Sequence, residues 1–226
     1  MFRDFETTYR NGTGDTKIEI FGFSRGAAMA REFANMIHDK YPSAKINFLG
    51  LFDTVAQEGA PNEANANVGL RLTIPNNVEF VAHAVATEEY RELFPLTSVM
   101  KYYGGIDVNL GFHIGNFPLT APSRYSPSDY KEFKGKRYWE KPFSGAHSDV
   151  GGGYADGSNL HALRWMYWAA RAHGVRVNWN KDDFNLRRNA FKQAPQYHDS
   201  RWMMDKLPFS DIGRFTRGVF SGNLEE

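Results

Sequence analysis

The pentapeptide GFSRG, residues 22–26, could do chemistry because it places a serine between two glycines. An apolar run, IEIFGF, comes before Ser24 and a helical pattern follows it. A Gly-x-Ser-x-Gly between a strand and a helix is typical of a nucleophile elbow, a tight turn that exposes the hydroxyl. Gly22 and Gly26 lack Cβ atoms, so we expect them to let strand and helix approach closely. The alternative is a turn in which Ser24 only caps the helix.

A serine hydroxyl is a poor nucleophile unless a base takes its proton and a carboxylate orients that base. In proteins with such an elbow, the three catalytic residues follow one another along the chain in the order serine, acid, histidine. Asp53 ends the apolar run 46–52, where a catalytic carboxylate is expected to emerge, although it could also cap a turn. His147 follows both residues and is the best candidate for the base. The backbone N–H of Arg25 is the expected oxyanion donor.

The loop GAHSDVGGGY places His147 among small residues. Asp149 is expected to hold this loop through side-chain hydrogen bonds, or to be an alternative acid less well placed than Asp53. Gly151, Gly152 and the glycine after them are expected to let the backbone turn tightly. A phosphate cradle is the lesser interpretation, because the loop has neither the P-loop lysine nor GxGxxG spacing.

The remaining histidines are scattered along the chain. His83 lies inside an apolar run and is expected to be a hydrogen-bonded core residue. Three lie on helical patterns, one in an irregular segment and one near the C-terminus: His38, His161, His173, His113 and His198. No HExxH motif and no cysteine is present, so we expect neither a metal nor another cofactor.

Apolar runs that alternate with helical patterns predict the fold class. The predicted strands cover residues 18–23, 46–52, 78–86 and 138–143. A helix is expected from Arg25 until Pro42 stops it, and another from an N-cap at Ser158 until Gly174 closes it. Strand–helix alternation is typical of an α/β protein with a mostly parallel sheet flanked by helices.

Composition places the chain among ordinary globular domains. Its 226 residues are 42% hydrophobic and have a formal net charge of +1, so no electrostatic argument favours nucleic acid. We expect one domain over residues 1–226, with neither a signal peptide nor a membrane-spanning segment. Residues 98–136 are aromatic and irregular, which favours a lid or a peripheral membrane-contacting insertion; a surface loop with its own small core is the alternative.

Three blocks, FGFSRGAAMAR, FLGLFDTV and GAHSDVGGGY, with HAVATEEYRELFP between the last two, resemble the α/β-hydrolase domain of the type VI secretion phospholipase effectors. The resemblance covers about residues 15–168. In that family the triad is the serine of the first block, the aspartate of the second and the histidine of the third, which here are Ser24, Asp53 and His147. The resemblance implies cleavage of phospholipid acyl esters in bacterial competitors. It also implies a secretion-apparatus partner, delivery to the target periplasm and an immunity protein.

Members of this family have a long region before the elbow that contains the early strands and a second oxyanion donor. Because the elbow here starts at residue 22, we expect the C-terminal part of the catalytic core. Two other functions stay open. One is a non-catalytic fragment that binds a lipid surface or a protein, and the other is an esterase for a different substrate.

Overall fold

The computed structural model describes residues 2–11, 17–56, 69–89, 91, 94, 96–99, 137–154, 156–178 and 197–199. All but two residues of the aromatic segment 98–136, the predicted insertion, lie outside this part of the chain. In chain order the elements are α1 (Phe2–Asn11), β1 (Ile18–Phe23), α2 (Arg25–Lys40), β2 (Ile46–Phe52), β3 (Val81–Ala86), β4 (Tyr138–Phe143), α5 (His147–Gly151) and α6 (Leu160–Ala172).

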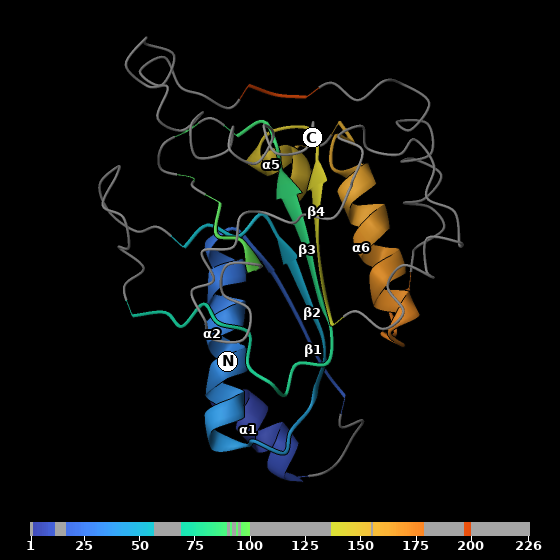
Figure 1. Ribbon diagram of the computed structural model, residues 1–226. Helices are drawn as coiled ribbons and strands as arrows, with labels where there is room; N and C mark the ends of the chain where they lie inside the picture. Colours follow the sequence, from blue (N-terminus) through green and yellow to red (C-terminus); the bar gives the residue numbers. More distant parts are fainter. Residues whose placement is uncertain are drawn as a thin grey trace.

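The four strands form one parallel sheet in the order β1-β2-β3-β4 (Figure 1). The predicted α/β-hydrolase-like fold class, a parallel sheet with flanking helices, is therefore confirmed. Pairing of Phe23 with Phe52 puts the carboxyl ends of β1 and β2 at the same edge of the sheet. The residues that follow these strands, Ser24 and Asp53, lie at that edge, where α/β proteins place their sites.

Helices cover both faces of the sheet, α2 on one side and α6 on the other (Figure 1). The α2 face buries aliphatic side chains such as Ile37, Leu49 and Leu51, and α1 adds the rings of Phe2 and Phe5. The α6 face is more aromatic and contains Phe48, Trp139 and Trp165, among others. Both faces of the sheet are apolar, which explains why its strands appear in the sequence as continuous apolar runs.

Three predicted elements differ from the structure. Strand β3 begins at Val81 rather than at Val78, which makes only an isolated bridge to Ile46. Helix α6 begins after Asn159, so the predicted N-cap at Ser158 is wrong by one residue. The predicted loop around His147 contains the short helix α5, which ends at Gly151 and is capped by Gly152 in a left-handed conformation.

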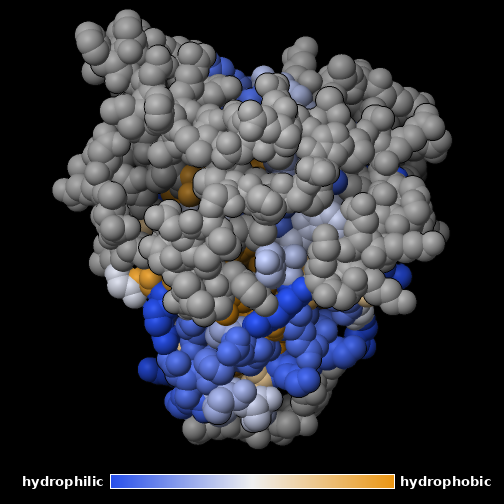
Figure 2. Space-filling view, in the orientation of Figure 1, coloured by the Kyte–Doolittle hydropathy of each residue, from blue (hydrophilic) through white to orange (hydrophobic). Residues whose placement is uncertain are grey.

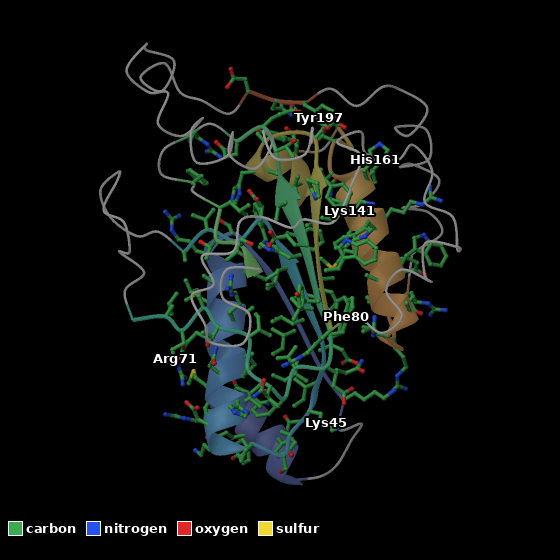
Figure 3. All side chains as sticks on the ribbon, in the orientation of Figure 1. Lys45, Arg71, Phe80, Lys141, His161 and Tyr197 are labelled. Carbon is green, nitrogen blue, oxygen red and sulfur yellow. The ribbon has the colours of Figure 1, made fainter. Side chains whose placement is uncertain are left out.

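The face of the molecule around α1 and the end of α2 is hydrophilic where the structure describes it (Figure 2). Figure 2 shows mostly hydrophilic residues, among those drawn in colour, over the lower part of the view, where α1 and the end of α2 lie. Arg71 pairs there with Glu32 and Asp39 of α2, and Figure 3 places Arg71 beside that helix. Among the described residues, no helix combines the length and apolarity needed to cross a bilayer.

Candidate active site

Ser24 sits in a strained turn between β1 and α2. Its φ is 59° and its ψ is −128°, and among the described residues other than glycine only Asp53 shares a positive φ. Such a backbone persists only where neighbouring groups hold it. The Ser24 N–H donates to Phe52 O at 3.0 Å, and Ser24 O accepts the N–H groups of Ala27 and Val55 at 3.0 and 3.3 Å. The turn is thereby tied to both α2 and the end of β2.

The two glycines of the elbow have different surroundings. A Cβ built on Gly22 would lie 2.5 Å from Gly26 O and 2.7 Å from Ala27 Cα, so only glycine fits. A Cβ built on Gly26 would meet nothing within 4 Å. The expected close-approach reason therefore applies to Gly22, and for Gly26 it is wrong.

This contrast predicts unequal losses of stability for two alanine variants. Gly22→Ala should destabilise the domain by about 3 kcal/mol, because the methyl group meets backbone atoms that cannot move without opening the turn. Gly26→Ala should stay within about 1 kcal/mol of the parent protein. Urea unfolding of the two variants measures the difference. Similar losses of stability in both would contradict the elbow geometry.

Asp53 is fully buried and has several fixed contacts. Its φ is 37°, and its N–H donates to Ala84 O at 2.7 Å. Oδ1 accepts the Ala86 N–H at 2.9 Å, and Oδ2 lies 2.7 Å from His147 Nδ1. Because a carboxylate only accepts, Nδ1 bears the proton in this contact and Nε2 keeps a lone pair.

His147 opens α5, beyond the carboxyl end of β4, and is 3% exposed. Its imidazole contacts two aromatic rings. The Phe23 ring is 4.5 Å away between centroids at 31°, and the Phe94 ring is 5.0 Å away at 66°. Phe23 directly precedes Ser24, so the base candidate and the nucleophile candidate share a neighbour.

The structure thus brings the three predicted triad residues to one edge of the sheet. The Ser24 N–H is hydrogen-bonded to the carbonyl of the residue before Asp53, and the Asp53 carboxylate is hydrogen-bonded to His147 Nδ1. Arg25 is the first residue of α2, where backbone N–H groups have no intrahelical partner. The partial positive charge at the helix N-terminus strengthens the stabilisation that this N–H can give to an oxyanion. A serine, a buried acid–imidazole pair and a helix N-terminus can together perform acyl transfer.

Asp149 holds the turn that presents His147. Its Oδ2 accepts the Ala146 N–H at 2.9 Å, and the Asp149 N–H donates to Ala146 O at 2.9 Å. Asp149 therefore makes the type of loop hydrogen bond expected of it, while the carboxylate at His147 Nδ1 belongs to Asp53.

The glycines after α5 close that helix. The N–H groups of Gly152 and Gly153 both donate to Ser148 O, at 3.0 and 2.9 Å. The phosphate-cradle alternative is not supported, because these donors are already used. Gly152 has a φ of 88°, and a Cβ on Gly151 would lie 2.0 Å from the Phe23 ring. Gly151 therefore lets α5 approach the aromatic ring beneath His147.

His198 is a residue near the site that the sequence did not predict. Its Nδ1 lies 2.7 Å from Asp149 Oδ1, and its N–H donates to Asp149 Oδ2 at 2.9 Å. The imidazole stacks on Tyr154, with 3.7 Å between centroids. The contact joins residues 49 positions apart, and nothing local in the sequence indicates it.

Two ionisable groups beside α5 have raised pKa values. Burial raises the pKa of Glu88, and the nearby Asp149 charge adds to the effect. Burial also raises the pKa of the Tyr197 phenol, which Figure 3 places at the α5 end of the molecule. Both groups favour their neutral forms more than they do in water.

His83 is a buried core residue with hydrogen-bond partners, as predicted. Its Nδ1 lies 2.8 Å from Glu140, and its Nε2 accepts the Thr54 N–H at 3.0 Å. Glu140 also accepts the Ser98 hydroxyl and the Val99 N–H. This network fixes the residue that follows Asp53, so it supports the turn at the acid.

His161 lies in α6, and His173 is the residue that caps the C-terminal end of that helix. Burial lowers the pKa of both His161 and His173, and the His173 ring stacks on Phe80 at 3.7 Å. His113 lies outside the described residues. Within the described ranges, no three acidic or imidazole side chains are grouped so that they could hold a metal ion.

Comparisons with solved structures gave partial matches. An uncharacterized protein from Pseudomonas aeruginosa shares 24% identity over 80% of this chain and 28% of its own length, with a TM-score of 0.48. The Tle1 effector, solved bound to the VgrG spike of the type VI secretion system, shares 28% identity over 59% of this chain and 24% of its own length, with a TM-score of 0.37. The chain therefore spans about a quarter of each. A search of curated proteins gave no match.

One family model matches residues 39–169, more than half of the chain. This range includes Asp53 and His147, and it begins after Ser24. The family is described as the catalytic domain of Tle1-like phospholipase effectors of the type VI secretion system. The chain belongs to this family of Tle1-like phospholipase effector catalytic domains.

Proposed function

We propose that this chain is a serine hydrolase domain that cleaves acyl esters of membrane phospholipids, with Ser24, Asp53 and His147 as its triad. The observation that supports this most is the 2.7 Å contact between the buried Asp53 carboxylate and His147 Nδ1, at the sheet edge where Ser24 occupies its strained turn. Membership of a phospholipase effector family supports the substrate class.

In the proposed reaction each of these groups has one role. His147 Nε2 takes the Ser24 proton while Oγ attacks the ester carbonyl carbon, and Asp53 stabilises the imidazolium that forms. The Arg25 N–H, at the positive end of α2, stabilises the oxyanion. The ester C–O bond then breaks and His147 gives its proton to the departing alcohol. Water, deprotonated by His147, attacks the acyl-enzyme and releases the fatty acid.

The proposed setting is attack on competing bacteria. The Tle1 neighbour was solved with a VgrG spike, which supports a secretion-apparatus protein as a partner of this domain. We propose delivery to the periplasm of the target cell, peripheral contact with its membrane and neutralisation by an immunity protein.

Fatty-acid release from vesicles tests the proposed function. The protein is incubated with phosphatidylethanolamine–phosphatidylglycerol vesicles, and free fatty acid is measured beside a Ser24→Ala variant. We expect release by the parent protein and none above the vesicle blank by the variant. Ser158→Ala serves as a control serine change away from the triad and should keep the parent rate. Equal release by parent and Ser24→Ala would exclude the serine mechanism, and vesicle binding without release would favour the non-catalytic module.

A further inference from the structure

The block HAVATEEYRELFP, residues 83–95, has no assigned role in the proposed reaction, yet it supplies side chains that touch His147. Glu89 is 1% exposed, and its Oε2 accepts the His147 backbone N–H at 3.2 Å. This carboxylate therefore ties the start of α5 to the segment that follows β3. A buried charge of this kind is costly unless it is paired and hydrogen-bonded.

Arg91 supplies that pairing. Its Nε donates to Glu89 Oε1 at 2.9 Å and its Nη2 donates to Oε2 at 2.8 Å, while its backbone N–H donates to Oε1 at 2.8 Å. The planar fork of a guanidinium fits a carboxylate in this way, whereas the single nitrogen of an ammonium cannot reproduce these two parallel contacts. The geometry of Glu89 thus depends on an arginine at position 91.

The same guanidinium also holds an aromatic ring. Its central carbon lies 3.6 Å from the centroid of the Phe94 ring, a cation–π stack. The centroid of the Phe94 ring in turn lies 5.0 Å from that of the His147 ring, at an angle of 66°. The Phe23 ring, which comes from β1, contacts the same imidazole at 4.5 Å. Rotation of the imidazole away from Asp53 would disturb both ring contacts.

We propose that Glu89, Arg91 and Phe94 are positioning residues that clamp His147, Glu89 at its backbone and Phe94 at its ring, with Arg91 joining the two. This proposal rests on the proposed function, since it makes His147 the base. The clamp holds Nδ1 toward Asp53, so that Nε2 keeps a fixed direction for proton transfer. Small displacements of a catalytic group are enough to cost a large factor in rate.

Two conservative variants test the clamp. Phe94→Leu keeps an apolar side chain but loses the ring contact, and Arg91→Lys keeps the charge but loses the fork and the flat stack. We expect kcat to fall by about tenfold in each, with KM within about twofold, because orientation rather than substrate binding is lost. Phe94→Tyr keeps an aromatic ring at this position, so its kcat should stay close to that of the parent protein. Arg71→Lys, a matched change in an exposed ion pair with Glu32, should leave kcat unchanged.

A second readout is independent of hydrolysis. The ¹⁵N chemical shifts of the His147 ring report its tautomer and its hydrogen bond to Asp53. In the parent protein they should show a single Nδ1–H form, and in Phe94→Leu and Arg91→Lys a second population should appear at unchanged far-UV circular dichroism.

The outcomes separate the two proposals. Hydrolysis that does not depend on Ser24 defeats the proposed function, while the ring shifts still decide whether the clamp exists. Ser24-dependent hydrolysis with unchanged kcat and unchanged ring shifts in both variants overturns the clamp alone. A fall in kcat that only follows the loss of folded protein also overturns it, because a structural contact would give that result.

Discussion

An Asp53→Asn protein is expected to fold and to lose about 10⁴-fold in kcat, with KM little changed. The asparagine Oδ1 can still accept the Ala86 N–H, which fixes the other end of the amide toward His147. An NH₂ group facing Nδ1 requires the lone pair on Nδ1, so the proton moves to Nε2. The imidazole then has no lone pair for the Ser24 hydroxyl. Steady-state release of fatty acid from mixed micelles measures the loss.

Asp39→Asn is the matched control for that variant. Asp39 is an exposed carboxylate of α2 paired with Arg71, and its replacement should keep kcat within about twofold. Circular dichroism and the unfolding midpoint show whether Asp53→Asn is folded. A folded Asp53→Asn protein with kcat within about tenfold of the parent would contradict the role given to Asp53.

The second large effect concerns stability, and it arises at Lys141. This lysine of β4 lies between Trp139 and Phe143 in sequence and is 8% exposed; Figure 3 places it on the side of the sheet that faces α6. Burial lowers its pKa from 10.5 to about 7. We expect Lys141→Met to raise the free energy of unfolding at pH 7 by about 3 kcal/mol, since the apolar side chain has no charge to desolvate.

The sign of the pH dependence follows from proton binding. Between pH 7 and 10.5 the unfolded chain holds a proton on Lys141 that the folded protein lacks. The parent protein therefore gains stability as the pH rises through this window, by up to about 1.4 kcal/mol per pH unit. The advantage of Lys141→Met should shrink accordingly when urea unfolding is measured at pH 7, 8 and 9.

Lys45→Met is the control for that series. Lys45 is an exposed lysine paired with Glu79 at 2.9 Å, and its loss should change stability by less than about 1 kcal/mol. A constant difference between Lys141→Met and the parent protein from pH 7 to 9 would contradict a desolvated ammonium at this position.

The strands could be predicted from the sequence where a polar residue or a turn ends each apolar run. The structure confirms β1 and β2 with the predicted bounds, and β4 as well. Strand β3 was predicted three residues too long, because Val78 and Phe80 are buried without being part of the strand. Burial produces the same apolar pattern in a strand and in the segment that leads into it.

Helix α1 was not predicted, although Phe2, Phe5 and Tyr9 recur at helical spacing and pack against Phe33 and Tyr41. The amphipathic pattern of this helix is present in the sequence, with charged residues between the aromatic ones. In contrast, the helical start at His147 was obscured in the sequence. Its neighbours are small and glycine-rich, and the turn is shaped by hydrogen bonds between Asp149 and Ala146 and by those that Ser148 O accepts.

Sequence order was enough to choose Asp53 and His147 as partners, and the structure joins them at 2.7 Å. Their catalytic roles stay predictions. The surroundings of His147 could not be derived, because Glu89 and Phe94 reach it from a segment more than 50 positions earlier. The same is true of the His198 contact with Asp149. Contacts of this kind depend on the tertiary fold and have no local pattern.

Covalent labelling with a fluorophosphonate, read by mass spectrometry, tests the central claim most directly. Trypsin releases Ser24 in the peptide IEIFGFSR, residues 18–25, so one adduct identifies the nucleophile. The triad assignment predicts a single phosphonylated serine on this peptide in the folded parent protein, slower labelling of Asp53→Asn and no labelling of Ser24→Ala. A folded parent protein that remains unlabelled at this peptide, or is labelled at another serine, would contradict the assignment of Ser24 as the nucleophile.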